Sequence, residues 1–304
     1  MLTLQEIISQ ESFSNLELLA SQVVEGFITG LHKSPYHGFS VEFVEHRIYN
    51  VGESKKHVDW KLYAKTDKLF VKKYEEETNL RCQILIDTSS SMYFPNSKFN
   101  KLKFSIWSAA AIIHLLKKQR DASGISLFSD QIDWHTKSKQ TISHQKMLFS
   151  ELEKLLHQKI ELKKASTNTA QILHHLAEQI HQRSLIILFS DMFSQDQPDE
   201  LFSALQHFRF KKHELIVFHV TDPSKEKELE FNNRPHRFVD LETGEAIKIN
   251  PSHIREHYKT QMQQYYENLK LKCSQYKIDF VEVDINKPFA DVLTTFLIKR
   301  QRLY

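Results

Sequence analysis

The fold is decided by one stretch, Arg81-Cys82-Gln83-Ile84-Leu85-Ile86-Asp87-Thr88-Ser89-Ser90-Ser91-Met92. It begins as a short apolar run, which is typical of a strand buried on both faces of a parallel sheet. An acid and three serines follow, so they fall just beyond the carboxyl end of that strand. Open α/β sheets bind their ligands at this end. The stretch therefore predicts a central strand with a ligand site where the strand ends.

The side chains of Asp87, Ser89 and Ser91 alternate, so in an extended loop they project to one side. One carboxylate and two hydroxyls are hard oxygen donors, which suit magnesium, manganese or calcium and not zinc or copper. The D-x-S-x-S pattern is weakly specific alone, because the same residue types also cap helices. The rest of the chain has to decide between a metal site and a helix cap.

The composition is that of an ordinary globular protein, with 304 residues, 40% hydrophobic and 26% charged. The formal net charge of +3 is too small to indicate nucleic acid, and no basic run is interleaved with aromatic residues. The glycine spacings form neither a P-loop nor a G-x-G-x-x-G turn, and there is no G-x-S-x-G nucleophile elbow. The standard nucleotide and hydrolase motifs are therefore excluded.

Targeting features predict a soluble, cytoplasmic protein without a membrane span. Cys82 and Cys273 are too few for a disulfide framework or a four-cysteine zinc site, so we expect reduced, buried thiols. The first residues contain an acid and no basic region, which is not the pattern of a secretory signal. The longest nearly apolar stretch, 105–116, is well short of the ~20 residues that a span needs.

Strands and helices alternate after the motif, which predicts an α/β fold with a doubly wound, mostly parallel sheet. The expected strands are 124–128, 132–135, 184–189, 215–220 and 280–283. The expected helices are 99–119, 146–156, a helix ending near 181, 198–208, 252–275 and one beginning at 288. Before the motif we expect a helix at 16–27, a strand at 39–43, a helical turn at 59–64 and a strand at 69–74. We divide the chain into an N-terminal extension (1–79) packed on the core and a main domain (80–304) with a polar hairpin insertion near 225–250.

A second apolar strand, 184–189, is also followed by a carboxylate, Asp191. Between the two strands in sequence, a polar loop presents Thr167 where a helix starts, with Ser166 and Thr169 as alternatives. In a parallel sheet these loops open at the same edge. The predicted metal ligands are Asp87, Ser89, Ser91, Thr167 and Asp191.

This order of residues resembles the metal-ion-dependent adhesion site of von Willebrand factor A domains, over roughly residues 80–222. The N-terminal segment resembles the signature of a bacterial family, domain-of-unknown-function family fifty-eight. The matching positions are Glu42-Phe43, Arg47, Tyr49, Gly52-Glu53, Asp59-Trp60, Ala64-Lys65 and Val71-Lys72. Three positions depart from the family pattern: Glu53 replaces an aspartate, Lys65 an arginine, and Ala165-Ser166 the glycines before Thr167.

The resemblance implies a Rossmann-type, von Willebrand A-like fold with one bound divalent cation, magnesium before manganese or calcium. It also implies an open coordination position, which a Glu or Asp of a partner protein would fill. Members of the family are often encoded beside MoxR-type AAA+ ATPases, so the implied partner is such an ATPase and the chain would be its adaptor. Because nothing in the sequence positions a general base or a nucleophile there, we expect no catalysis.

Other readings stay open. Phosphoryl transfer to Asp87, as in haloacid dehalogenase-type phosphatases, needs a second acid two residues later, where this chain has Ser89. The segment 253–257 matches the zinc-binding pattern H-x-x-E-H, although a surface helix with an apolar stripe explains it better. His174 and His181 would share a helical face, which most often means a solvent-facing or core-edge position.

Overall fold

The computed structural model describes residues 16–32, 46–48, 60–67, 70–72, 80–95, 99–157, 169–193, 198–241, 243–287 and 290–302. The chain divides into two compact units: Met1–Val24 with Leu80–Leu303, and Glu25–Asn79 with Tyr304. The expected division into an N-terminal extension (1–79) and a main domain (80–304) stays a prediction. The packing of the N-terminal extension on the core stays a prediction.

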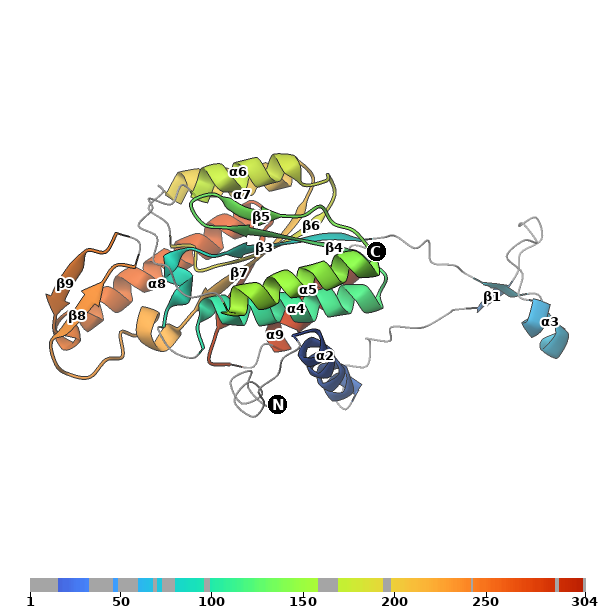
Figure 1. Cartoon of the computed structure of the whole chain (residues 1–304), viewed down its shortest axis with the longest axis horizontal. Helices are drawn as coiled ribbons and strands as arrows, with labels where there is room; N and C mark the ends of the chain where they lie inside the picture. The colour runs from blue at the N-terminus through green and yellow to red at the C-terminus, as the bar shows by residue number, and fades with distance from the viewer. Residues whose placement is uncertain are drawn as a thin grey trace. The chain divides into compact units, whose positions relative to one another are not determined.

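Six strands form the central sheet of the larger unit, in the order β10-β7-β6-β3-β4-β5 (Figure 1). Their bounds are β3 (Arg81–Asp87), β4 (Ala122–Phe128), β5 (Ile132–His135), β6 (Leu185–Ser190), β7 (Glu214–Thr221) and β10 (Asp279–Asp284). Neighbouring strands are parallel, except that β5 runs antiparallel to β4 at one edge. The predicted α/β class with a doubly wound, mostly parallel sheet is confirmed.

The direction of the chain across the sheet reverses beside β3. After β3 the chain adds β4 and β5 on one side, then returns to place β6, β7 and β10 on the other. Ile84 in β3 consequently lies opposite Ile125 in β4 and Ile187 in β6. Such a reversal is the topological switch point at which open α/β sheets bind ligands, outside the carboxyl ends of the strands. The serine-rich loop after β3 therefore begins at this point.

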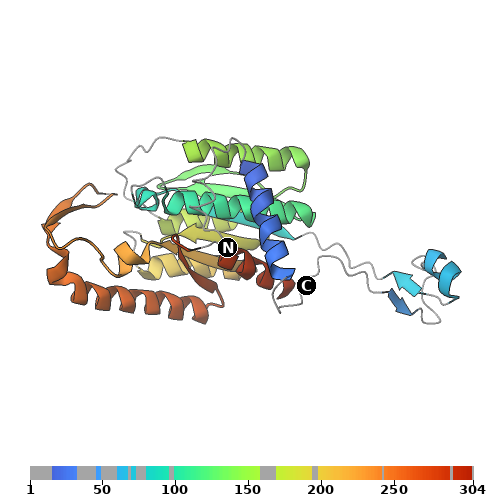
Figure 2. The same ribbon diagram turned by 90° about the horizontal axis from the view of Figure 1, so that it is seen from below.

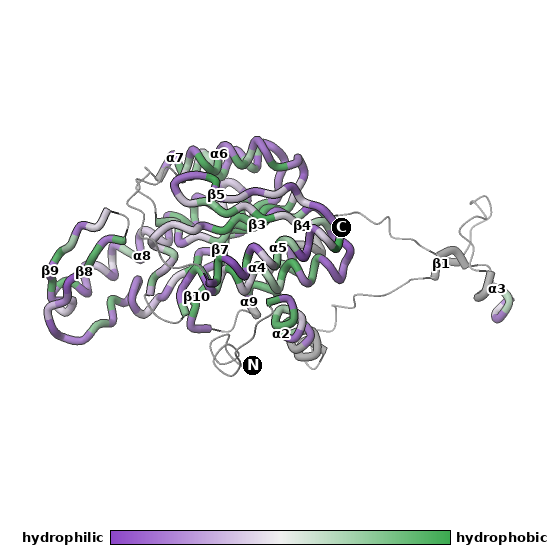
Figure 3. Tube along the Cα trace, viewed as in Figure 1, coloured by the Kyte–Doolittle hydropathy of each residue, from purple (hydrophilic) through white to green (hydrophobic). Residues whose placement is uncertain are grey.

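Helices cover both faces of the sheet (Figures 1 and 2). One face carries α4 (Lys101–Lys118), α5 (Ile142–His157) and α9 (Ala290–Arg302), and the other carries α6 (Thr169–Gln179), α7 (Pro198–Phe210) and α8 (Pro251–Gln275). The central strands between the two layers are hydrophobic (Figure 3) and almost entirely buried. Each fully buried large apolar side chain contributes about 1.5–3 kcal/mol relative to an exposed one.

Helix α4 shows how the local sequence sets the element and its burial. The side chain of Asn100 caps its first turn by accepting a hydrogen bond from the Lys103 amide at 2.9 Å. The helix is buried on nearly every side, as the apolar residues on nearly all of its faces predict. Its first residue, Lys101, is buried as well, with 1% of its surface exposed, and this charged exception matters for the site below.

Two short segments lie near the carboxyl ends of the strands. The 3-10 helix η2 (Ser90–Tyr93) follows β3, and the π-helical turn η3 (Pro223–Lys227) follows β7. The chain then forms the hairpin of β8 (His236–Val239) and β9 (Ala246–Ile249) within the expected polar segment. Gly244 in its turn has φ 78°, a conformation that favours glycine.

In the smaller unit, β1 (His46–Ile48) and β2 (Phe70–Lys72) pair antiparallel, and α3 (Trp60–Thr66) matches the expected helical turn.

The helix α2 (Leu16–His32) begins where we expected it. The strand expected at 39–43 lies outside the described residues. Of the helices in the described ranges, none has the length and hydrophobicity to cross a membrane.

Candidate functional site

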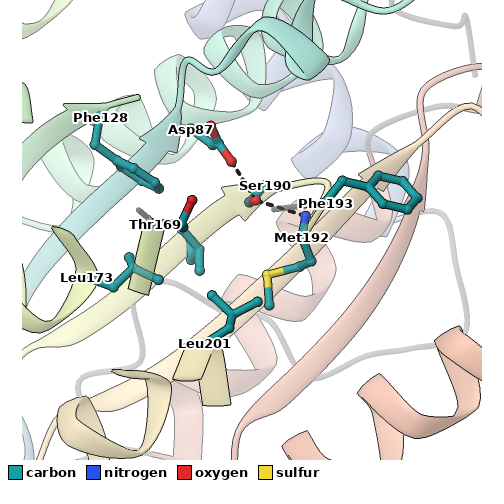
Figure 4. A pocket seen from close by; sticks show the side chains of 9 residues that line it. Asp87, Phe128, Thr169, Leu173, Ser190, Met192, Phe193 and Leu201 are labelled. Carbon is teal, nitrogen blue, oxygen red and sulfur yellow. Dashed lines mark hydrogen bonds between the residues drawn. The ribbon is translucent and has the colours of Figure 1, made fainter. Parts of the chain in front are cut away.

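Asp87 is the last residue of β3, and its carboxylate is buried between two strands. Its Oδ1 accepts a hydrogen bond from the Ser89 amide at 2.9 Å. Its Oδ2 accepts one from the hydroxyl of Ser190, the last residue of β6, at 2.7 Å (Figure 4). Ser190 Oγ also accepts a hydrogen bond from the Met192 amide at 2.9 Å. Ser190, which our sequence analysis missed, therefore joins the two strands across the switch point.

The environment of Asp87 favours a nearby cation. Burial, and after it the negative charge of Asp191, raise the pKa of Asp87 to about 6. Hydrogen bonds from Ser89 and Ser190 act in the opposite direction but do not cancel this effect. The raised pKa means that the surroundings do not fully compensate an ionised carboxylate, and a bound cation would supply that compensation.

The two motif serines lie close enough together to share one ion. Ser89 Oγ and Ser91 Oγ are 3.1 Å apart. Two adjacent oxygens in an octahedral shell at 2.0–2.1 Å from magnesium are separated by about 3 Å. Together with the carboxylate of Asp87, the two hydroxyls make an all-oxygen set of the type that magnesium prefers. The residues present at the end of β3 thus fit the cation that the fold implies.

The structure also bears on the loop threonine. Thr167 and Ser166 lie outside the described residues. Thr169 is the first residue of α6, is buried, and lines a small pocket together with Asp87 and Ser190 (Figure 4). Of the three candidates, Thr169 is the one that the described residues bring next to Asp87.

Asp191 directly follows β6, so it lies at the same edge of the sheet as Asp87, as the parallel topology requires. It is fully buried. Its carboxylate is already engaged, because Oδ1 accepts a hydrogen bond from the Phe193 amide at 3.1 Å and Oδ2 accepts one from Lys101 Nζ at 2.6 Å. The position of Asp191 is as expected, but its direct contact is with a lysine. The role of the five predicted side chains as metal ligands stays a prediction.

Besides Ser190, two charged residues of the site, Lys101 and Glu226, were not predicted from the sequence. Lys101 Nζ donates to Glu226 Oε1 at 2.6 Å in addition to Asp191. Burial acts to lower the pKa of Lys101, but Asp191 and Glu226 outweigh it and the pKa ends above its ordinary value. Lys101 therefore stays charged. The sequence does not distinguish it, because Lys103 stands two residues later in the same first turn of α4.

The most deeply buried charges of this cluster are mainly negative. Three carboxylates (Asp87, Asp191 and Glu226) and one ammonium leave a formal charge of minus two when all are ionised. His219, whose Nε2 donates to the Asp191 carbonyl oxygen at 2.9 Å, adds no positive charge at neutral pH, because burial lowers its pKa to about 4. Lys225, whose Nζ lies 6.0 Å from the Phe94 ring that Lys101 also faces, is a further positive charge near this cluster.

The histidine patterns do not form a metal site. In the described ranges, no three histidine, cysteine or acidic side chains come together so that they could hold an ion. His253 and His257 lie on exposed positions of α8, as the surface-helix reading predicts. His174 instead contacts His207 of α7, with their Nδ1 atoms 3.0 Å apart, and His181 contacts Arg81. Cys82 and Cys273 are free and buried, as expected.

The family of the chain follows from its sequence over most of its length. Residues 45–268 match the family described as "Protein of unknown function DUF58". The chain belongs to the DUF58 family. This confirms the family resemblance that we noted from the N-terminal signature. The association with MoxR-type ATPases is not tested by this match and stays a prediction for this DUF58 chain.

Curated relatives of the DUF58 chain match over a limited region. They include "Uncharacterized protein Rv1480" of Mycobacterium tuberculosis and "Uncharacterized protein Mb1516" of Mycobacterium bovis. Each is 29% identical over 100 residues, which is 33% of this chain and 32% of the relative. The match thus spans about a third of the length of these relatives, and their names indicate no activity.

Similar solved structures include the conserved hypothetical protein BatB from Bacteroides thetaiotaomicron, at 15% identity and a TM-score of 0.47 over 74% of this chain and 100% of that one. An aerotolerance-related membrane protein from Bacteroides fragilis has 13% identity and a TM-score of 0.44, over 72% and 99%. The VWA domain of SpRpn10 has 11% identity and a TM-score of 0.37, over 71% and 94%. The fold is assigned from the strand order and not from these similarities.

Proposed function

We propose that this DUF58 chain is a divalent-cation-dependent protein-interaction module, with its cation site at the switch point between β3 and β6. The observation that carries the proposal is the meeting of Asp87, Ser89 and Ser91 with Asp191 at one edge of the sheet. The raised pKa of Asp87 supports the same reading, because a nearby cation would stabilise its ionised carboxylate. Magnesium is the cation we expect, with manganese or calcium as substitutes.

Each side chain of the proposed site would have a distinct role in binding the ion. Asp87, Ser89, Ser91 and Thr169 would hold the ion through oxygen atoms, with Thr167 outside the described residues as the alternative to Thr169. Asp191 would contribute negative charge beside them. A divalent cation held mainly by neutral hydroxyls keeps positive character and an open coordination position, which suits a Glu or Asp of the partner.

The arrangement favours binding over catalysis. Ser89 occupies the position where a phosphoryl-transferring aspartate would need a second acid as general acid. We therefore keep phosphoryl transfer only as an alternative, and a MoxR-type AAA+ ATPase as the partner that the family resemblance suggests, in a cytoplasmic setting.

Calorimetric titration with magnesium chloride tests the cation site. The wild type should bind one ion, and Asp87→Ala should lose that binding because the only carboxylate of the D-x-S-x-S motif is gone. A suitable control is Asp130→Ala, which removes an acid from the exposed turn between β4 and β5. Equal binding by the wild type and Asp87→Ala would reject the site.

A separate assay addresses the alternative. We expect no hydrolysis of a generic aryl phosphate by the purified protein in the presence of magnesium. Turnover that disappears in Asp87→Asn would favour the phosphoryl-transfer enzyme over the interaction module.

A further inference from the structure

A buried lysine lies between the proposed cation site and the segment that follows β7. Lys101 Nζ is 2.6 Å from both Asp191 Oδ2 and Glu226 Oε1. The rings of Phe94 and Phe193 lie 5.7 and 5.9 Å from the ammonium, within cation–π range. Lysine is almost never fully buried unless it is paired. This one is paired twice and enclosed by aromatic rings, so its position is well defined.

The lysine and a divalent cation would draw on the same carboxylate. Asp191 Oδ2 already contacts the ammonium, and Asp191 Oδ1 accepts the Phe193 amide. An ammonium fixed on Asp191 both neutralises that carboxylate and repels a dication nearby, and burial strengthens these effects because solvent screens them weakly. The D-x-S-x-S motif alone gives no hint of such a competitor.

We propose that Lys101 is an internal counter-cation that competes with the divalent cation for Asp191 and so sets how tightly the site binds the ion. This inference rests on the proposed cation site. Lys101 acts through Asp191 and is therefore a positioning residue and not a ligand. Its hold on Glu226 keeps it in place, because Glu226 is itself fixed by the Asp222 amide, which donates to its Oε2 at 2.7 Å.

Removing the ammonium tests the competition directly. In Lys101→Met, a neutral side chain of similar length leaves Asp191 free for the ion, so magnesium should bind at least about tenfold more tightly in calorimetric titration. Lys154→Met is the matched control, because it makes the same change of charge on an exposed position of α5. Its binding constant should equal that of the wild type.

A double variant separates pairing from net charge. Lys101→Met with Glu226→Gln removes one positive and one negative charge, so the formal charge of the cluster is unchanged. If Lys101 competes for Asp191, this variant still binds magnesium more tightly than the wild type. The double variant can also replace Lys101→Met if the single variant does not fold without the ion. In the single variant both Asp191 and Glu226 lose their partner, whereas in the double variant only Asp191 does. Its melting temperature should rise more on adding magnesium than that of the wild type.

The outcomes distinguish the two proposals. If both Lys101 variants are folded and bind within about twofold of the wild type, while Asp87→Ala binds nothing, Lys101 does not compete and the cation site stands. If the wild type and the Lys101 variants all fail to bind magnesium, the cation site and the role of Lys101 are both refuted.

Discussion

Replacing Ser190 by alanine should destabilise the protein far more than removal of a buried serine usually does. Ser190 Oγ donates to Asp87 at 2.7 Å and accepts from the Met192 amide at 2.9 Å, and Ser190 itself is 3% exposed. A hydrogen bond to a charged group contributes about 1.5–3 kcal/mol, and an amide left buried without a partner costs about 1–3 kcal/mol. Because the two terms share one site and do not add fully, we expect a loss of roughly 2–4 kcal/mol in the free energy of unfolding.

The measurement is urea unfolding followed by circular dichroism at pH 7.5 with a chelator. This pH lies above the pKa of about 6 of Asp87, so the carboxylate is ionised when the hydrogen bond is tested. Ser105→Ala is the matched control, since Ser105 is equally buried but its hydroxyl donates to the Lys101 carbonyl oxygen within α4. It should cost no more than about 1 kcal/mol. Equal losses in the two variants would refute the view that Ser190 holds the carboxylate across the switch point.

Three further predictions concern packing, pH and the loop threonine. Gly124→Ala should lower the free energy of unfolding by about 1–3 kcal/mol in urea unfolding, since the new Cβ would lie 2.8 Å from the Thr136 carbonyl oxygen. An unchanged free energy of unfolding would contradict this tight contact. Burial lowers the pKa of His213, so on acidification the unfolded chain binds a proton at this residue before the folded chain does. The free energy of unfolding should therefore fall as the pH drops below about 6.5. The fall should be less steep in His213→Gln, whereas the exposed-site control His175→Gln should show the same slope against pH as the wild type. Thr169→Val, which removes a hydroxyl but little volume, should weaken magnesium binding by roughly ten- to a hundredfold, and an unaltered affinity would point to Thr167 instead.

The sheet and the shared edge of the two aspartates were predictable because they follow from short-range patterns. The apolar runs before Asp87 and Asp191 each end at a carboxylate, and burial on both faces is typical of strands in a parallel sheet covered by helices. Parallel pairing then fixes that both carboxylates lie at the same edge. The bounds of the main elements in this part of the chain differ from expectation by a few residues, because helix and strand ends depend on caps and partners.

The neighbours of the site were harder to predict because long-range packing sets them. Lys101 stands at a helix start, where a lysine is ordinarily solvated, and its partner Glu226 is 125 residues away in the chain. No local periodicity encodes such a pair. In the sequence, Ser190 is the polar residue that ends an apolar strand. Only the register of β6 against β3 places its hydroxyl within hydrogen-bond distance of the Asp87 carboxylate.

The position of β3 between β4 and β6 also has a consequence for the order of assembly. The strand pairs Cys82 with Leu185, so a long excursion of the chain has to close before β6 can dock, and such closures are slow steps in folding. A fragment that stops ahead of β6 would carry every serine of the motif and still form no pocket. A cation that binds only the native state would stabilise that state relative to late folding intermediates. It would bind complete chains and not fragments that lack β6.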